Sequence, residues 1–337
     1  MRAVLLTRYG GPEVLRIADV PAPEPREGEV RVRVRLVGVN FAEVLSRRGL
    51  YGWAPRLPYI LGMEALGDVD AIGAGVTSHR VGERVIVGTQ FGTYADFVCV
   101  PAARVLAAPA ELTDEECAAF AVNYLTAWIG LMELARLRPS DTLLVTSAAG
   151  GVGSAAVQLG ARFGARVIGA AGAGKQEVVR GLGAAVALDY STPDWEARLR
   201  EATGGRGVDV TLEMTGGAVY RAAIRNVAPM GRVVMAGASD AFPRTRNPLA
   251  RVAALRNLPR TNIFDMLRRS YGVMSFHVGW LLDAGAVHAA WADLVRFTSA
   301  HAIRPVVART FPFEEIADAH RLLEERRNAG KVLVRIG

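Results

Sequence analysis

The stretch that decides the fold is TLLVTSAAGGVGSAAVQLG, residues 142–160. Its first part, Thr142–Ser147, is an uncharged run typical of a buried strand, and the glycine-rich turn SAAGGVG follows directly. Small residues after Gly153 favour a helix that packs closely on the strand. A glycine-rich turn between strand and helix lets backbone approach a pyrophosphate, and the helix N-terminus offers N–H groups to it. This order predicts a dinucleotide-binding unit.

The turn itself supplies the first predicted binding residues. We expect the cofactor's pyrophosphate to contact Ala149, Gly150, Gly151, Val152 and Gly153. A closely packed strand–helix turn that binds no ligand is the structural alternative.

The chain around this turn alternates strand and helix patterns from residue 140 to about 237. The other expected strands are Arg166–Ala171, Ala185–Leu188, Asp209–Glu213 and Arg232–Ala236, and Gly272–Phe276 could add one more. Such alternation is typical of parallel strands with helical crossovers, that is, a doubly wound sheet.

The first 115 or so residues have a different, β-rich pattern. Val30–Val39 alternates valine with arginine, and Val81–Val87 and Tyr94–Val100 are further short apolar runs between turn signals. Thr113 followed by three acids predicts a helix start. The fold class is therefore α/β, with a barrel-like β-rich unit beside the doubly wound unit.

The end of the second parallel strand bears on the choice of dinucleotide. Sites for NAD carry an acid there for the ribose 2′-hydroxyl, but Arg166–Ala171 ends in alanines and is followed by Gly172. Lys175 and Tyr190 are nearby in the pattern. We therefore expect a 2′-phosphate and NADPH, the alternative being that Lys175 is a solvated lysine at a helix start.

Composition narrows the class of protein. The chain has 337 residues, 51% hydrophobic and 22% charged, which indicates a globular protein of two domains. Its net charge is +7, yet only two of 40 basic residues are lysines and the arginines are scattered among acids. This pattern disfavours nucleic-acid binding.

Cysteine content and apolar runs bear on the compartment. Two cysteines are too few for a disulfide framework. Arg8 follows only five uncharged residues, which is too short a run for the core of a signal peptide. The longest uncharged stretches are too short or too rich in glycine to predict a membrane span. We expect a cytoplasmic protein without a membrane partner.

Several motifs together resemble one family over essentially the whole chain. They are VGVNFAEVLSRRG (37–49), LGMEALG (61–67), GERVIV (82–87), NYLTA (123–127), AAGGVG (148–153) and GKV (330–332). They resemble the zinc-free quinone oxidoreductase branch of the medium-chain dehydrogenase/reductase superfamily. The resemblance implies a GroES-like catalytic domain (1–121 and 286–337), a Rossmann NADPH-binding domain (122–285) and a homodimer.

The resemblance also bears on metal binding. Zinc-containing members carry a cysteine where this chain has Asn40, and a histidine where it has Met63. Neither an amide nor a thioether replaces those zinc ligands, so we expect no metal. Glu64 then remains as a structural group.

The remaining site residues follow from the resemblance. It places Asn40 near the nicotinamide and Tyr51 in the substrate pocket, where a phenol can donate a proton; a packed turn tyrosine is the alternative. The resemblance also gives Asn123 and Thr126 contacts to the nicotinamide, although both could simply satisfy core hydrogen bonds. The other cofactor-binding residues it implies are Gly237, Ser239, Phe276 and Asn328.

Two further residues and one arginine-rich segment also stand out in the sequence. His277 follows Phe276 but, as a single histidine, more often packs than reacts, and Lys331 is interpreted as the first residue of the last strand. The segment Phe242–Arg269 carries seven arginines. It could be a lid, a dimer element, a docking face for an acyl carrier or a solvated helix.

Three functions remain open. Without zinc, the chemistry suits an electrophile that is already activated, so we expect NADPH-dependent reduction of a quinone or an α,β-unsaturated carbonyl. An enoyl reductase acting on an acyl-CoA or carrier-bound thioester is the second hypothesis. A non-enzymatic NADPH-binding protein is the third.

Overall fold

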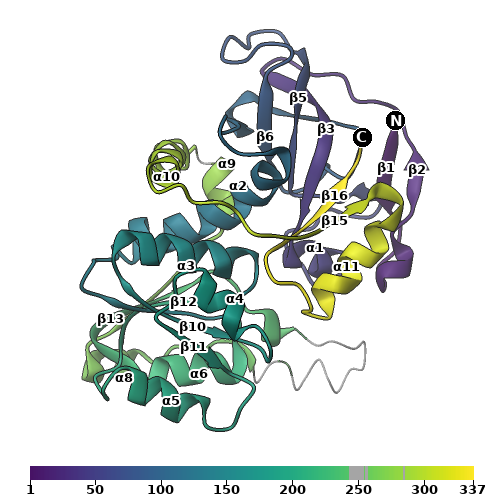
Figure 1. Ribbon diagram of the computed structural model, residues 1–337. Coiled ribbons are helices and arrows are strands. Elements are labelled where there is room, and N and C mark those ends of the chain that lie inside the picture. The colour runs from purple at the N-terminus through teal and green to yellow at the C-terminus, as the bar shows by residue number, and fades with distance from the viewer. Residues whose placement is uncertain (243–253, 255–256, 284) are drawn as a thin grey trace. The chain divides into compact units, whose positions relative to one another are not determined.

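The computed structural model describes residues 1–242, 254, 257–283 and 285–337, and it divides into two compact units (Figure 1). Unit 1 comprises Met1–Val122, Val278–Val295 and Arg304–Gly337. Unit 2 comprises Asn123–His277 and Arg296–Ile303. The predicted α/β class, with a GroES-like unit and a Rossmann-like parallel sheet, is confirmed.

Unit 2 is built on a six-stranded parallel sheet with the order β11-β10-β9-β12-β13-β14. The strands are β9 (Thr142–Val145), β10 (Arg166–Ala171), β11 (Val186–Asp189), β12 (Val208–Glu213), β13 (Val227–Met235) and β14 (Gly272–Ser275). The predicted strand Arg232–Ala236 is only the second half of β13, which begins earlier because Val227 pairs with Val208 across a register shift.

Helices connect these parallel strands and cover both faces of the sheet. They are α3 (Gly151–Phe163), α4 (Gln176–Gly181), α5 (Trp195–Ala202), α6 (Gly217–Arg225) and α8 (Ile263–Arg269), with a short turn η4 (Ser239–Ala241). α3 lies on one side, and α5, α6 and α8 lie on the other (Figure 1). The strand order reverses between β9 and β12, so the loops after these two strands meet at the switch point where such sheets bind ligands.

The arginine-rich segment is only partly described. Residues 243–253 and 255–256 lie outside the described residues, so the hypotheses for Phe242–Arg269 apply here only to its last part, which ends in α8.

Unit 1 contains a seven-stranded sheet and a three-stranded sheet. The larger has the order β15-β16-β3-β5-β6-β8, with β7 also paired to β3, and the smaller has the order β2-β1-β4. The strands are β1 (Arg2–Leu6), β2 (Ile17–Asp19), β3 (Glu29–Val39), β4 (Tyr59–Ile60), β5 (Glu64–Ile72), β6 (Arg84–Gly88), β7 (Phe97–Pro101), β8 (Val105–Ala107), β15 (Val307–Pro312) and β16 (Lys331–Arg335).

The helices of unit 1 are mostly short. They are η1 (Pro12–Val14), α1 (Phe41–Arg47), η2 (Ala102–Arg104), α9 (Val278–Asp283), η6 (Phe313–Glu315) and α11 (Ile316–Glu324), while α10 (His288–Ala300) contributes to both units. Buried apolar side chains from β1, β3, β5, β6, β15 and β16 form one core with α11.

The longest helix is α2 (Asp114–Trp128), which continues into a π-helical turn η3 (Ile129–Leu134). The predicted start is confirmed: Thr113 N donates to Glu116 at 2.8 Å, and Glu116 N donates to the Thr113 hydroxyl at 3.2 Å. The segment Asp114–Leu134 is long and apolar enough to cross a membrane, but 78% of its apolar window is buried, as in a helix inside a protein core.

A buried carboxylate fixes the start of α1. Glu43 accepts hydrogen bonds from Asn40 N at 2.6 Å, Met63 N at 2.7 Å and the Tyr94 hydroxyl at 2.6 Å. The Tyr94 oxygen also lies 3.1 Å from His320 Nε2. Burial raises the pKa of Glu43 to about 7, although the hydrogen bonds from Asn40 and Tyr94 act against this rise. α1 is thereby fastened to the beginning of β5.

We predict that Glu43 makes the folding stability depend on pH. Its pKa is about 7 in the folded chain against an ordinary 4.5, so the folded chain binds this proton more tightly. The free energy of unfolding should therefore decrease as pH rises from 4.5 to 7, by on the order of 3 kcal/mol from this group. Urea unfolding at several pH values measures the slope.

The Glu43→Gln variant should show a smaller slope than the parent, since it lacks the titrating group. Tyr94→Phe is the matched control, because it loses one hydrogen bond to Glu43 but keeps the carboxyl. Equal slopes for the parent and Glu43→Gln would contradict the assignment.

Candidate functional site

The glycine-rich turn of unit 2 brings backbone atoms close together. Gly150 N donates to the Ser147 carbonyl at 2.8 Å, and a Cβ at Gly153 would overlap that same carbonyl. A Cβ at Gly151 would lie 2.7 Å from the Asn123 side-chain amide. A side chain at Gly153 would collide with backbone, whereas one at Gly151 would require the Asn123 side chain to move.

The helix that follows leaves donors for an anion. α3 has 13 residues, and its N-cap Gly150 makes no side-chain capping bond. The first N–H groups of a helix have no partner within it, and the helix dipole favours negative charge there. The predicted residues from Ala149 to Gly153 thus fit the pyrophosphate of a dinucleotide.

Glu213, at the end of β12, organises the switch point and was not singled out from the sequence. Its carboxylate accepts from the Thr146 hydroxyl at 3.0 Å, Thr215 N at 3.0 Å and Gly216 N at 2.9 Å. The Ser147 and Thr215 hydroxyls lie 2.9 Å apart. Burial raises the pKa of Glu213 to about 7. This one side chain holds the loops after β9 and β12 together.

The loop after β13 packs against the loop after β12. Ser239 N donates to the Met214 carbonyl at 3.2 Å, and a Cβ at Gly237 would lie 3.3 Å from the same oxygen. The predicted residues Gly237 and Ser239 are therefore brought beside the switch point. Phe276 follows β14, and its ring lies beside Gly130 in η3.

The end of β10 carries no acid. Ala171 and Gly172 stand there, and the Tyr190 hydroxyl lies 3.8 Å from the Cβ position of Gly172. Lys175 is the N-cap residue of α4, one turn beyond Gly172. The structure thus brings Gly172 and Tyr190 together at the strand end where the sequence predicts recognition of the ribose.

Asn123 and Thr126 are both buried, with 4% and 7% of their surface exposed, on the part of α2 that belongs to unit 2. Asn123 lies over Gly151, as the close approach of its amide to that Cβ position shows. Asn123 can therefore be a buried core residue and still lie beside the glycine-rich turn.

In unit 1, Asn40 joins a compact polar cluster with Glu64 and Lys331. Lys331 Nζ donates to Asn40 Oδ1 at 2.6 Å and forms an ion pair with Glu64 Oε1. Asn40 Nδ2 donates to the same Glu64 oxygen at 3.1 Å. Only 3% of the Lys331 side chain and 1% of the Glu64 side chain are exposed. Lys331 does begin β16, as the sequence indicates, but its buried contacts were not foreseen.

Tyr51 lies in a small aromatic cluster of unit 1. Its ring centroid is 5.3 Å from that of Trp53 and 6.3 Å from that of Phe91, both edge-on. Burial raises the pKa of Tyr51 to about 12, so its phenol keeps its proton at neutral pH. Asn328 is buried, and its Nδ2 donates to the Gly330 carbonyl at 2.8 Å.

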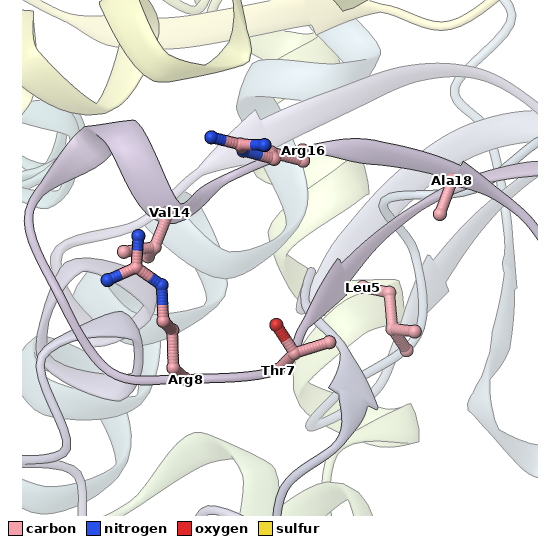
Figure 2. Close-up of a pocket in the computed structure, with 6 residues that line it drawn as sticks. All are labelled: Leu5, Thr7, Arg8, Val14, Arg16 and Ala18. Carbon is pink, nitrogen blue, oxygen red and sulfur yellow. The ribbon is translucent and has the colours of Figure 1, made fainter.

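A separate hollow of about 300 Å³ lies beside strands β1 and β2 of unit 1 (Figure 2). None of the residues that line it is among the predicted site residues. The lining residues are Leu5, Thr7, Arg8, Val14, Arg16 and Ala18. Figure 2 shows the side chains of Arg8 and Arg16 among the residues that line it.

The donor set at Asn40 and Met63 does not fit zinc. An amide and a thioether are not the thiolate and imidazole ligands that catalytic zinc uses, and Glu64 is already paired with Lys331. Among the described residues, no group of three or more His, Cys, Asp or Glu side chains is placed to hold a metal ion.

Two known sequence families match the chain. The family "Alcohol dehydrogenase GroES-like domain" matches residues 26–110, and the family "Zinc-binding dehydrogenase" matches residues 182–334. A rat protein, the synaptic vesicle membrane protein VAT-1 homolog, is 36% identical over 99% of this chain and 84% of its own length.

Solved structures resemble the chain over its whole length. A mycobacterial protein in complex with NADPH has a TM-score of 0.87 at 30% identity, covering 100% of both chains. A quinone oxidoreductase from Pseudomonas syringae has a TM-score of 0.88 at 28% identity, covering 99% of both chains. The JamJ enoyl reductase has a TM-score of 0.87 at 25% identity, covering 100% of this chain and 99% of its own.

These likenesses agree with the chemistry of the two sites. Unit 2 holds a dinucleotide turn at the switch point of a parallel sheet, which supports binding of a nicotinamide cofactor. In unit 1, an amide and a thioether stand at Asn40 and Met63, and Glu64 is paired with Lys331. The chain belongs to the zinc-independent quinone oxidoreductase branch of the medium-chain dehydrogenase/reductase superfamily of oxidoreductases.

Proposed function

We propose that the protein is an NADPH-dependent reductase of quinones and α,β-unsaturated carbonyl compounds. The observation that carries the proposal is that the chain has both a glycine-rich dinucleotide-type turn, in unit 2, and a polar, non-zinc cluster around Asn40, in unit 1. Without a Lewis acid to polarise an alcohol, the substrate must already be electrophilic. The likeness to a Pseudomonas syringae quinone oxidoreductase supports this substrate class.

The reaction divides between cofactor and protein. Bound NADPH supplies a hydride to the electrophile, and the product also takes up a proton. Unit 2 binds and orients the cofactor through the turn from Ala149 to Gly153. Unit 1 contributes Tyr51, which stays protonated at neutral pH and can donate a hydrogen bond to the substrate oxygen.

We predict that Lys175 selects NADPH over NADH. The strand end at Ala171–Gly172 lacks an acid that would repel a 2′-phosphate, and Lys175 and Tyr190 flank it. Lys175→Ala should raise the Kd for NADPH about 10-fold, because one charge-assisted hydrogen bond is lost. Quenching or enhancement of nicotinamide fluorescence measures both affinities.

The Kd for NADH should change little in Lys175→Ala, and Lys175→Arg should keep the preference for NADPH. A parent protein that binds NADH more tightly than NADPH would refute the choice of cofactor.

We predict that Tyr51→Phe lowers the kcat for an enone such as a crotonyl ketone by about 100-fold, since a general acid typically contributes at least this much. NADPH oxidation is followed by absorbance with 1,4-benzoquinone, phenanthrenequinone, the enone and a crotonyl thioester. Tyr59→Phe is the matched control, because Tyr59 packs edge-on against the same Phe91 ring but its hydroxyl is bonded to Ser46 at 2.7 Å. A full enone rate in Tyr51→Phe would exclude the phenol as proton donor.

The same assay separates the two alternatives. Turnover of the thioester alone would favour an enoyl reductase, which the likeness to JamJ supports. Tight NADPH binding without turnover of any electrophile would favour a non-enzymatic role.

We also propose that the protein is a homodimer formed through unit 2. Among the described residues, β14 is the last strand of the parallel sheet, and large apolar side chains are exposed on it or on the segments next to it in the chain or sheet. They are Met230 (80% exposed), Ile263 (74%), Phe264 (83%) and Leu267 (76%). A group of exposed apolar side chains at a free sheet edge favours pairing with a second copy.

We predict that Ile263→Asp with Leu267→Asp converts a dimer to a monomer, because the carboxylates would have to be desolvated in the contact. Sedimentation velocity of the parent and the variant measures the mass. The control is Val81→Asp, since Val81 is 64% exposed but lies in unit 1. A parent protein that sediments as a monomer would refute the dimer.

A further inference from the structure

The hollow of about 300 Å³ in unit 1 lies where strands β1 and β2 stop pairing (Figure 2). The two strands pair from Arg2 with Asp19 as far as Val4 with Ile17, and the ladder ends there. Leu5, Thr7 and Arg8 line the hollow from the first segment, and Val14, Arg16 and Ala18 line it from the second. Figure 2 shows these two segments on opposite sides of the hollow.

The charges in the lining are all positive. Its two charged side chains are Arg8 and Arg16, both exposed, and no acid lines the hollow. Among the described residues, neither guanidinium group has a partner in a hydrogen bond or ion pair. Arg2 differs, since it is paired with Asp96 at 2.9 Å. The hollow therefore carries two uncompensated positive charges.

The nearest acid in the chain does not neutralise these charges. Glu13 lies in η1, outside the lining, and its carboxylate accepts from Gly11 N at 3.0 Å. Hydrogen bonds from its own backbone N–H and from Gly11 lower the pKa of Glu13, and the charge of Arg8 contributes least to this lowering. Arg8 is thus left to interact with an anion in the hollow.

The rest of the lining is apolar apart from one hydroxyl group. Leu5, Val14 and Ala18 supply apolar surface, and Thr7 supplies a hydroxyl that can donate a hydrogen bond. A volume of about 300 Å³ is at the lower end for ligand pockets, so the hollow suits a small molecule. A small organic anion matches both the apolar and the charged part.

The backbone around the hollow is held by contacts that do not involve the two arginine side chains. Val14 is buried in the core of unit 1, with 5% of its surface exposed. Gly10 N donates to the Arg47 carbonyl at 3.0 Å, and Leu5 pairs with Ile60 of β4 on the other side of β1. Both arginines can therefore be replaced without the loss of a structural contact.

We propose that this hollow binds a small phosphate monoester that carries an apolar organic group. A phosphate monoester has a charge of about −1.5 to −2 at pH 7, which matches two unpaired guanidinium groups. The planar fork of arginine forms paired hydrogen bonds with phosphate oxygens. The organic group would contact Leu5, Val14 and Ala18. The site uses none of the residues assigned to the proposed reaction, so it goes beyond that function.

Phenyl phosphate is the probe, and calorimetric titration of the full chain measures its binding. We expect saturable binding at one site per chain. Inorganic phosphate lacks the apolar group and phenol lacks the charge, so each should bind about 10-fold more weakly or worse. Inorganic phosphate that binds as tightly as phenyl phosphate would overturn the assignment to a monoester.

Variants separate the geometry of the site from the charge of the protein. Arg8→Gln and Arg16→Gln should each raise the Kd for phenyl phosphate about 10-fold, because each removes one charge-assisted contact. The double variant Arg8→Lys/Arg16→Lys keeps the charge but loses the paired hydrogen bonds, so its Kd should lie between those of the parent and the glutamine variants. Ala18→Leu fills part of the hollow and should weaken binding of phenyl phosphate more than that of inorganic phosphate.

Arg80→Gln is the matched control, because Arg80 is an exposed arginine of unit 1 that does not line the hollow. It should leave the Kd unchanged. An increase equal to that of Arg8→Gln would show that only net charge matters, and would overturn the proposal. The absence of saturable binding to the parent would do the same.

A titration at saturating NADPH separates this site from the cofactor turn of unit 2. An unchanged Kd for phenyl phosphate supports the hollow as the binding site. Loss of binding would mean that the probe occupies the cofactor turn, and would overturn the proposal. Because the measurement is of binding alone, a parent protein that reduces no electrophile would refute the proposed function and leave this site standing.

Discussion

The buried ion pair between Glu64 and Lys331 is the interaction on which the polar part of unit 1 depends. A lysine with 3% of its side chain exposed is stable as a cation only beside a carboxylate that is itself well held. Glu64 meets this requirement through Val122 N and Asn40. Lys331 and Asn40 are 291 residues apart, so the cluster is complete only when the last strand has joined β3.

Glu213 in unit 2 has a role similar to that of Glu64 in unit 1, because each buried carboxyl group accepts several hydrogen bonds from separate segments. The Glu213 carboxyl group accepts from the loops after β9 and β12, and the first of these loops carries the glycine-rich turn. Glu64 begins β5 and Glu213 ends β12. Each carboxyl group accepts hydrogen bonds from backbone N–H groups outside regular strands, and so holds those segments in place. In each unit these backbone groups are thus held by hydrogen bonds within the protein itself.

Much of the fold could be predicted because its signals are local. In β3 the valines Val30, Val32 and Val34 are buried, while Arg31 and Arg33 both reach Asp70 at 2.7 Å, as the alternation indicated. The parallel sheet followed from the turn at Gly150–Gly153 and the alternation around it. The beginning of β13 could not be read in the same way, because it depends on pairing with Val208 across a register shift.

The site was predictable to the extent that its residues are neighbours in sequence. The turn from Ala149 to Gly153 has the predicted geometry because five consecutive residues determine it. The role of Lys331 depends on partners from β5 and from the N-terminal end of α1, and no local pattern brings these together. The sequence marks Lys331 by its place in the GKV motif (330–332) and by the scarcity of lysine, but neither signal names its partners.

That scarcity has a chemical consequence. Apart from the amino group of Met1, which donates to the Val20 carbonyl at 2.8 Å, the chain has only two primary amines, on Lys175 and Lys331. Lys331 is shielded by burial, whereas Lys175 is partly exposed at the start of α4. Amine-directed reagents such as active esters or reductive methylation are thus confined to very few positions. Of these positions, the one at the start of α4 follows β10 closely in the chain, so a single isotopic or fluorescent label there would test the proposed contact of Lys175 with NADPH.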